Sequence, residues 1–402
     1  MGEMEFDALG AWAWDLGRSD STGERPQPGA EIMVIPTGGT FHAKGKGTMS
    51  VSLKRANALV LGCFLAGAPA MGHAHAASPG EVPTSAYEHP QTLVTLADGR
   101  RLNLFCLGSG SPTVVMEAGG GDDSLSFQAV QARVANVTRV CSYDRAGMGF
   151  SDPSPYPTTL MHVIADLHGL LDRAHIGRPI VLVGHSDGGL YAAFYAATYG
   201  QQVGGMVLID PDSPGLDQSA LSVLDQPWLT TWRSDEQRDI AQARDCLTLA
   251  RRGALIAKPS QYATCLDDPP HHDAALHHLL DTQLSRPTEQ SAIYTQDVDT
   301  TPAANNTLSP AEKVFQATHF DFGDKPFVIL SGTNEQSGLP LAERTKVNQA
   351  MLANQAELAA RSSEGRQILI DSSTEYLQLA KPDVVVQAIT EVVEKVRKRS
   401  AS

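Results

Sequence analysis

The expected fold is decided by residues 181–190, which read Val-Leu-Val-Gly-His-Ser-Asp-Gly-Gly-Leu. An apolar strand runs into Gly-x-Ser-x-Gly, and a segment rich in small residues follows, with Ala192, Ala193, Ala196 and Ala197. A serine between glycines, placed where a buried strand becomes a helix, indicates a sharp and strained turn that presents the hydroxyl at the carboxyl end of the strand. Ser186 is therefore the candidate nucleophile.

Composition limits the classes of partner. The chain has 402 residues, of which 42% are hydrophobic and 19% charged, which suits one large domain or a domain with an insertion. The net charge of −14 argues against nucleic acids and anionic membranes as partners. The charge says little about the substrate, which we expect to be a small molecule.

The first 76 residues precede the expected domain. Residues 1–48 show no apolar periodicity, and we interpret them as a mis-called start or a disordered extension, with translation beginning at Met49. Residues 49–76 combine the basic pair Lys54 and Arg55, a short apolar run and a small-x-small site, which is typical of a secretory signal peptide.

Cleavage near Ala76 or Ala77 would export the protein to the periplasm or the medium, without a stable membrane anchor. The apolar run at 56–67 is too short to span a bilayer. The alternative is a disordered extension that precedes a core helix.

Cysteine usage agrees with export. Cys106, Cys141, Cys246 and Cys265 remain after the expected cleavage, and an even count in an oxidising compartment suggests two disulfides. Three pairings are possible, and local reasoning favours Cys106–Cys141 on core strands and Cys246–Cys265 within a helical hairpin. The alternative is that all four are buried thiols.

Strand and helix patterns alternate along most of the chain, which predicts right-handed βαβ units and a mostly parallel sheet with helices on both faces. Residues 213–322 break this rhythm with helical stretches and no buried strand, so we expect a helical insertion there. The predicted strands are 93–96, 101–106, 112–117, 138–143, 181–185, 203–209, 327–330 and 367–370.

Three ordered motifs carry a resemblance to a known family. They are Glu-Ala-Gly-Gly-Gly at 117–121, Asp-Arg-Ala-Gly-Met-Gly-Phe-Ser-Asp at 144–152, and Gly-His-Ser-Asp-Gly-Gly at 184–189. Together they resemble the α/β-hydrolase superfamily, in particular an exported bacterial branch. The resemblance implies an α/β-hydrolase fold with an eight-stranded sheet, a core at 88–212 and 323–398, and a helical cap at 213–322. It also implies that Cys106 lies close to Cys141, because the second and fourth strands are neighbours in that fold.

The resemblance also implies roles for individual residues. Ser186 lies on the nucleophile elbow, and the backbone amides of Asp187 and Gly120 would bind the oxyanion. Glu335 takes the position of the triad acid after a late strand, and Asp210 is the alternative.

The general base is where the chain departs from the family. The family places a histidine before an aromatic residue near the end of the chain, whereas this chain has Glu375 before Tyr376 and no histidine after His319. A glutamate, with a reference pKa of about 4.3 against about 6.5 for histidine, accepts a serine proton poorly. We interpret His185 as a packing residue, and the histidines of the expected cap as part of a solvated surface (His271, His272, His277, His278 and His319).

Two functions from different classes remain open. The first is an exported, carboxylesterase-like serine hydrolase of small ester or acyl substrates, with a degenerate triad. The second is a catalytically impaired binding protein on the same fold, and a structural or interaction protein is a third class. The sequence has no metal, nucleotide or flavin motif, so we expect no cofactor.

Overall fold

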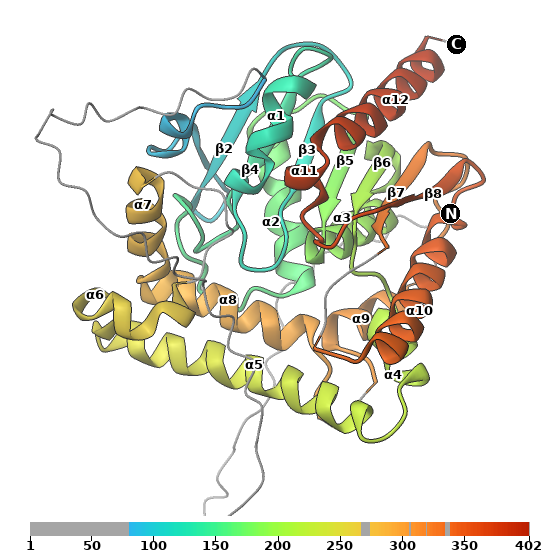
Figure 1. Cartoon of the computed structure of the whole chain (residues 1–402). Coiled ribbons are helices and arrows are strands. Elements are labelled where there is room, and N and C mark those ends of the chain that lie inside the picture. The colour runs from blue at the N-terminus through green and yellow to red at the C-terminus, as the bar shows by residue number, and fades with distance from the viewer. Residues whose placement is uncertain (1–79, 267–273, 305–306, 319, 334–337, 402) are drawn as a thin grey trace, which may run out of the picture. The chain divides into compact units, whose positions relative to one another are not determined.

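The computed structural model describes residues 80–266, 274–304, 307–318, 320–333 and 338–401 (Figure 1). The N-terminal extension and the expected signal peptide lie outside the described residues, as does Glu335. Among the described residues, no helix has both the length and the apolar character needed to cross a membrane.

The described strands form one eight-stranded sheet in the order β1-β2-β4-β3-β5-β6-β7-β8. The pairs β1–β2 and β2–β4 are antiparallel and the remaining pairs are parallel, which confirms the predicted mostly parallel sheet. The strands are β1 Leu93–Thr95, β2 Arg101–Leu107, β3 Val114–Glu117, β4 Val140–Tyr143, β5 Ile180–His185, β6 Val203–Ile209, β7 Phe327–Gly332 and β8 Gly365–Ile370.

Helices cover both faces of this sheet because successive residues of a strand point to opposite sides. On β5, Leu182 packs with α2 (Leu160–Arg173) and α3 (Asp187–Thr198). Its neighbours Val181 and Val183 pack on the other face, with α1 (Gln128–Val134) and α12 (Pro382–Ser400). Strands buried on both faces read as continuous apolar runs, which is why the central strands could be recognised in the sequence.

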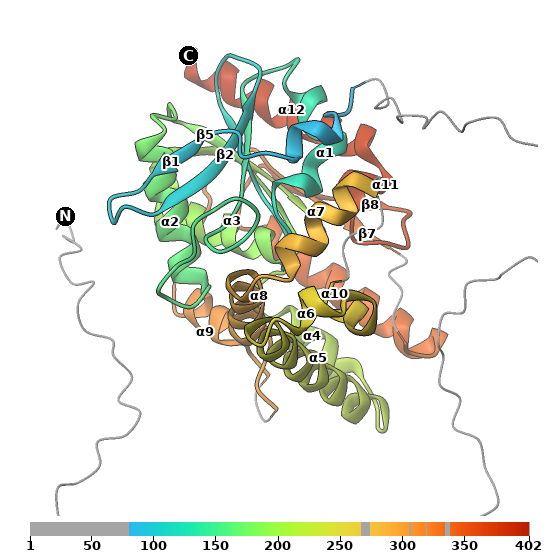
Figure 2. The same ribbon diagram turned by 90° about the vertical axis from the view of Figure 1, so that its left-hand side faces the viewer.

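The described chain between β6 and β7 contains helices and no strand. Figures 1 and 2 show α5, α6 and α8 gathered at one end of the sheet. The six described α-helices between β6 and β7 are called the helical insertion below. They are α4 Leu216–Val223, α5 Trp228–Arg251, α6 Ala254–Ala257, α7 Ala274–Leu284, α8 Pro287–Thr300 and α9 Pro310–Gln316.

The closing part of the chain returns to the sheet. Helix α10 (Leu341–Ala359) connects β7 to β8, and a turn after β8 leads into the short helix α11 (Leu377–Ala380) and then α12. The described chain also contains short 3-10 helices, which are η1 Thr84–Tyr87, η2 Ser124–Phe127, η3 Gly200–Gln202 and η4 Pro259–Cys265.

Both of the favoured disulfides are present. Cys106 on β2 and Cys141 on β4 are directly opposed in the antiparallel register and are bonded to each other. Cys246 on α5 is bonded to Cys265 at the end of η4, which ties two parts of the helical insertion together.

Candidate active site

Ser186 occupies the turn between β5 and α3 with φ 51° and ψ −125°, a backbone conformation that costs a non-glycine residue free energy. Main-chain hydrogen bonds hold Ser186 in this conformation. Its N–H donates to Ile209 O at 3.1 Å, and its carbonyl accepts from Gly189 N at 2.7 Å and from Asp212 N at 3.0 Å. The residue is half-buried. This geometry is that of a nucleophile elbow at the carboxyl end of a central strand.

The elbow lies directly against the loop that follows β3. A Cβ at Gly188 would stand 2.3 Å from Ala118 O and 2.4 Å from Glu117 O, so only glycine permits this approach. A Cβ at Gly120 would stand 2.7 Å from Oδ2 of Asp187. The glycine-rich loop and the start of α3 are therefore in contact, as the two expected oxyanion donors require.

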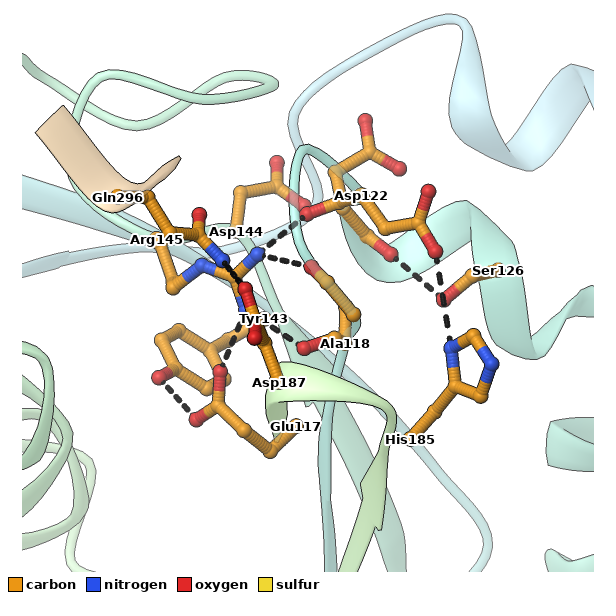
Figure 3. A network of polar contacts seen from close by, with 12 residues as sticks. Glu117, Ala118, Asp122, Ser126, Tyr143, Asp144, Arg145, His185, Asp187 and Gln296 are labelled. Carbon is orange, nitrogen blue, oxygen red and sulfur yellow. Dashed lines mark hydrogen bonds and ion pairs between the residues drawn. The ribbon is translucent and has the colours of Figure 1, made fainter. Parts of the chain in front are cut away.

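Arg145 fixes the orientation of that loop (Figure 3). Its guanidinium donates to Ala118 O at 2.7 Å, to Asp122 O at 3.1 Å and to Gly119 O. In a trans peptide, the N–H of the next residue points opposite to the carbonyl. The Gly119 carbonyl faces Arg145, so the N–H of Gly120 points away from it, and Gly120 lines a cavity.

Arg145 is itself held by a buried anion. Nη1 lies 2.8 Å from Oε1 of Glu117, and both side chains are almost fully buried. Tyr143 donates its hydroxyl proton to the other carboxylate oxygen. Burial raises the pKa of Glu117 while Arg145 opposes that rise, and Glu117 in turn keeps the pKa of Arg145 above its usual value despite the cost of burial. Arg145 of the second motif thus orients the glycine loop.

The two expected acid positions differ in what the structure shows. Asp210 follows β6 with φ 41°, and its carboxylate accepts from the Gly332 N–H at 3.0 Å and from Gln355 Nε2 at 3.3 Å. These contacts join β6, β7 and α10. Glu335 lies outside the described residues, so its place relative to Ser186 stays a prediction.

Glu375 is half-buried in the turn between β8 and α11. Burial is the main reason why the pKa of Asp122 is raised to about 7 and that of Asp212 well above its usual value, and the Glu375 charge adds to both. The next residue is Tyr376, and the centroid of its ring lies 4.9 Å from the centroid of the His185 ring. The segment that replaces the family's histidine therefore lies near both the glycine loop and the elbow.

A pair of carboxyl groups beside the candidate nucleophile was missed by sequence reasoning. The side chains of Asp187 and Asp212 share a hydrogen bond, and Gln296 of α8 donates to Oδ2 of Asp187 at 2.8 Å. Burial raises the pKa of Asp212 well above its usual value, and the contact with Asp187 adds to that rise. The sequence drew attention to Asp187 only for its backbone amide, because nothing local shows that Asp212 turns back to it.

The histidines weighed as alternative bases lie in different surroundings. His185 is buried against Asp122, with 3.8 Å between Nδ1 and Oδ2, and burial lowers its pKa to about 4. His277 and His278 are exposed on α7, whereas His271, His272 and His319 lie outside the described residues. In the described ranges, no three His, Cys, Asp or Glu side chains are grouped so as to hold a metal ion.

A cavity of about 680 Å³ opens beside the loop and the helical insertion. Its walls come from the loop around Gly120 and Gly121, from α5 and α8, and from Tyr376. Cys246 and Cys265, which form the second disulfide, also line it. A cavity of this size suits a small organic molecule.

Comparisons with known proteins bear on the family and the fold. Residues 114–388 match the model of the alpha/beta hydrolase family. A 104-residue region is 34% identical to the uncharacterized protein YqjL of Bacillus subtilis (strain 168), covering 26% of this chain and 41% of that protein. A 116-residue region is 31% identical to a cis-3-alkyl-4-alkyloxetan-2-one decarboxylase of Shewanella oneidensis, covering 28% of this chain and 36% of that enzyme. The chain thus matches less than half the length of either relative.

The fold is also found in solved structures. A haloalkane dehalogenase variant, DbeA-M1 from Bradyrhizobium elkanii, superposes with a TM-score of 0.55 at 17% identity, covering 78% of this chain and 98% of that one. At this identity the likeness shows the fold alone. From the family match and the sheet topology, the chain belongs to the alpha/beta hydrolase family.

Proposed function

We propose that this protein is an exported serine hydrolase of carboxylesterase type that acts on small ester or acyl substrates. The observation that carries the proposal is the strained Ser186 turn packed against a glycine loop whose carbonyls are bound by Arg145. That arrangement leaves a nucleophile and two main-chain donors, Gly120 and Asp187, at one edge of the sheet. The helices at 213–322 act as a cap over this edge.

In the proposed reaction, the Ser186 hydroxyl attacks the substrate carbonyl while its proton passes to a base. Charge develops on the carbonyl oxygen, and the amides of Gly120 and Asp187 stabilise it. The leaving alcohol takes up the proton, and water then releases the acyl group from Ser186 by the same steps.

Glu375 is the base in this proposal, with Glu335 or Asp210 as the accompanying acid. Support for Glu375 comes from its electrostatic effect on Asp122 beside the loop and on Asp212 beside the elbow. We expect slower turnover than with histidine.

The presence of Glu375 where the family has a histidine favours a second candidate function, that of a binding protein without efficient turnover. Replacement of a triad base by a weaker one costs several orders of magnitude in rate, while the cavity and the loop persist. The cavity of about 680 Å³ would then serve for ligand binding alone.

Hydrolysis of p-nitrophenyl butyrate by the wild-type protein, S186A, E375Q and E375H separates these candidates. Wild-type activity that disappears in S186A and falls in E375Q supports the hydrolase with Glu375 as base. An inactive wild type with a strongly active E375H supports the impaired protein. Equal rates in all four variants would overturn both assignments. Labelling of Ser186 by a fluorophosphonate, located by mass spectrometry, reports nucleophilicity independently of turnover.

Export is part of the same proposal. Two disulfides within the described residues support it, because disulfides persist in oxidising compartments. The expected N-terminus after processing is at Ala77 or Ser78. Mass measurement of the protein recovered from the periplasm or medium of a bacterial host checks this, and an unprocessed chain kept in the cytoplasm would contradict it.

A further inference from the structure

The carboxyl group of Asp187 lies directly against the residues expected to bind the oxyanion. Asp187 is itself one of them, and a Cβ at Gly120, the other, would stand 2.7 Å from Oδ2 of Asp187. Asp187 is only 7% exposed, so water screens its charge weakly. A negative charge in this place opposes the charge that develops on a substrate carbonyl oxygen. A working oxyanion site therefore requires donors that hold this carboxyl group and offset its charge.

One donor to Asp187 is Gln296, which reaches it from α8 (Figure 3). Its Nε2 lies 2.8 Å from Oδ2 of Asp187 and would stand 3.4 Å from a Cβ at Gly120. Gln296 is fully buried, and its Oε1 has no hydrogen-bond partner among the described residues. A buried carbonyl oxygen without a donor costs free energy. Stability alone therefore does not account for an amide at this place.

A second donor to Asp187 comes from the chain after β6. The side chains of Asp212 and Asp187 share a hydrogen bond, and the Asp212 N–H donates to Ser186 O at 3.0 Å. Burial is the main reason why the pKa of Asp212 is raised well above its usual value, and the charge of Asp187 adds to this rise. Asp212 therefore keeps its proton and donates it to Asp187. Two segments far apart in the sequence thus supply donors to one carboxyl group.

Helix α8 is docked on the core by the face that carries Gln296. Residues three and four positions apart lie on one side of a helix, as do Thr295, Gln296 and Asp299. Oγ1 of Thr295 accepts from the Thr158 N–H at 2.9 Å, and Oδ2 of Asp299 accepts from the Leu160 N–H at 2.7 Å. These contacts hold the helix in place, whereas the Gln296 contact reaches the elbow.

We propose that Gln296 is a positioning residue for the hydrolysis, which acts through Asp187, with Asp212 as the second donor. The two donors hold the Asp187 carboxyl group and offset its negative charge, so that the amides of Asp187 and Gly120 stabilise the oxyanion. The helical insertion thereby takes part in catalysis, because the oxyanion site is complete only while α8 is docked. This inference rests on the proposed function, since it concerns the reaction assigned to Ser186.

The first experiment compares kcat and KM of Q296L and T295V for p-nitrophenyl butyrate. T295V removes the acceptor of the Thr158 N–H, so it weakens the docking of the same helix and leaves the donors to Asp187 in place. We expect kcat of Q296L to fall by about tenfold or more with KM changed less than about threefold, because the lost contact matters in the transition state. T295V should keep most of the wild-type kcat. An equal loss of kcat in both variants, or a change confined to KM, overturns the inference.

Substitutions at Asp212 test the same carboxyl group from its other donor, and they keep the test valid if Q296L does not fold. D212L has no donor at this place, whereas the amide of D212N supplies an N–H to Asp187. We expect kcat of D212L to fall by about tenfold or more, and D212N to retain several times the kcat of D212L. Equal kcat values in D212L and D212N would contradict the role of Asp212 as donor. Thermal unfolding of every variant shows whether folded proteins are compared.

A third measurement does not depend on turnover. Butylboronic acid mimics the tetrahedral transition state, because Ser186 Oγ bonds to boron, the boron becomes a tetrahedral anion, and the serine proton passes to a base or to solvent. An oxygen on boron then takes the place of the oxyanion. We expect calorimetric titration to show about tenfold weaker binding by Q296L than by the wild type or T295V.

The ester and the boronic acid together separate the inference from the proposed function. If the wild type binds the boronic acid more tightly than Q296L but does not hydrolyse the ester, the proposed function is contradicted and the role of Gln296 at the oxyanion site stands. If the wild type hydrolyses the ester and Q296L matches T295V in both assays, the hydrolase is supported and the role of Gln296 is contradicted. A folded wild type that neither hydrolyses the ester nor binds the boronic acid would overturn both.

Discussion

Gln296 donates a hydrogen bond from Nε2 to Oδ2 of Asp187 at 2.8 Å, so that helix α8 holds the residue that follows the candidate nucleophile. Both side chains are buried. Q296L would leave the Asp187 carboxyl without this donor, and we expect unfolding free energy to fall by about 1–3 kcal/mol. Urea unfolding checks this against Q237L, whose side chain donates to the Pro302 carbonyl at 3.0 Å. An equal loss in both variants would contradict a special role for the Gln296 contact.

Substitutions at Arg145 and Glu117 are expected to affect stability and activity differently. R145M leaves the fully buried Glu117 carboxylate unpaired and should destabilise the fold by about 3–5 kcal/mol. The double variant R145M/E117Q should recover much of that stability, because it removes the buried charge. Its esterase kcat should remain low, since the Ala118 and Gly119 carbonyls still lack their donor. A fully active double variant would show that Arg145 does not position the loop.

Gly188 and Gly177 form a matched pair of substitutions. G188A would place a methyl group 2.3 Å from the Ala118 carbonyl oxygen, so the loop or the elbow must move. G177A meets nothing within 4 Å. We expect G188A to lower the melting temperature and abolish ester hydrolysis, and G177A to behave like the wild type. Thermal denaturation and p-nitrophenyl butyrate assays measure both, and an active G188A protein would be inconsistent with contact between elbow and loop.

Ser186 itself is expected to reduce stability. Its positive φ is strained for a side-chain-bearing residue, at a cost on the order of 1–3 kcal/mol. S186G should therefore unfold at a higher temperature than S186A, although neither variant can form an acyl intermediate. Calorimetry compares the two directly. If S186G is no more stable than S186A, the turn is not strained in solution.

Asp297 predicts a pH dependence of stability. Its folded-state pKa is raised from 3.8 to about 7, mainly by burial and then by Asp187 and Asp239. The folded state therefore keeps a proton that the unfolded state releases, so this contribution is complete below pH 3.8 and is lost as pH rises through 7.

We expect D297N to be more stable than the wild type at pH 8, by about 2–4 kcal/mol, and to differ less at pH 5. Urea unfolding at both values measures the difference. D245N changes an exposed carboxylate on α5 and serves as the control. If the free energies of unfolding of D297N and the wild type differ by the same amount at pH 5 and at pH 8, the raised pKa of Asp297 is contradicted.

Much of the fold could be predicted from the sequence because its signals are local. Continuous apolar runs such as that of β5 identified buried strands, and the glycines around Ser186 identified the turn. The cysteine pairing also followed, since Cys106 and Cys141 lie on strands and Cys246 and Cys265 are separated by few residues. Alternation of strands and helices then predicted the parallel sheet.

The site could be predicted only in part. The hydrogen bond between Asp187 and Asp212 depends on the path of the chain after β6, and the contact of Gln296 depends on how the helical insertion docks. Such contacts join residues far apart in sequence and leave no periodic signal. Glu335 lies outside the described residues, so the choice between Glu335 and Asp210 as the acid stays open to experiment.

The bond between Cys246 and Cys265 joins two residues that face the cavity, so oxidation and ligand recognition share one piece of wall. The redox state of these two cysteines therefore affects the shape of the cavity wall. In protein folded in a reducing cytosol, Cys246 and Cys265 would be free thiols, and we expect the cavity wall to be more flexible and to select less strictly among ligands. In protein folded in an oxidising compartment, we expect the disulfide to fix this wall and the ligand preference to be narrower.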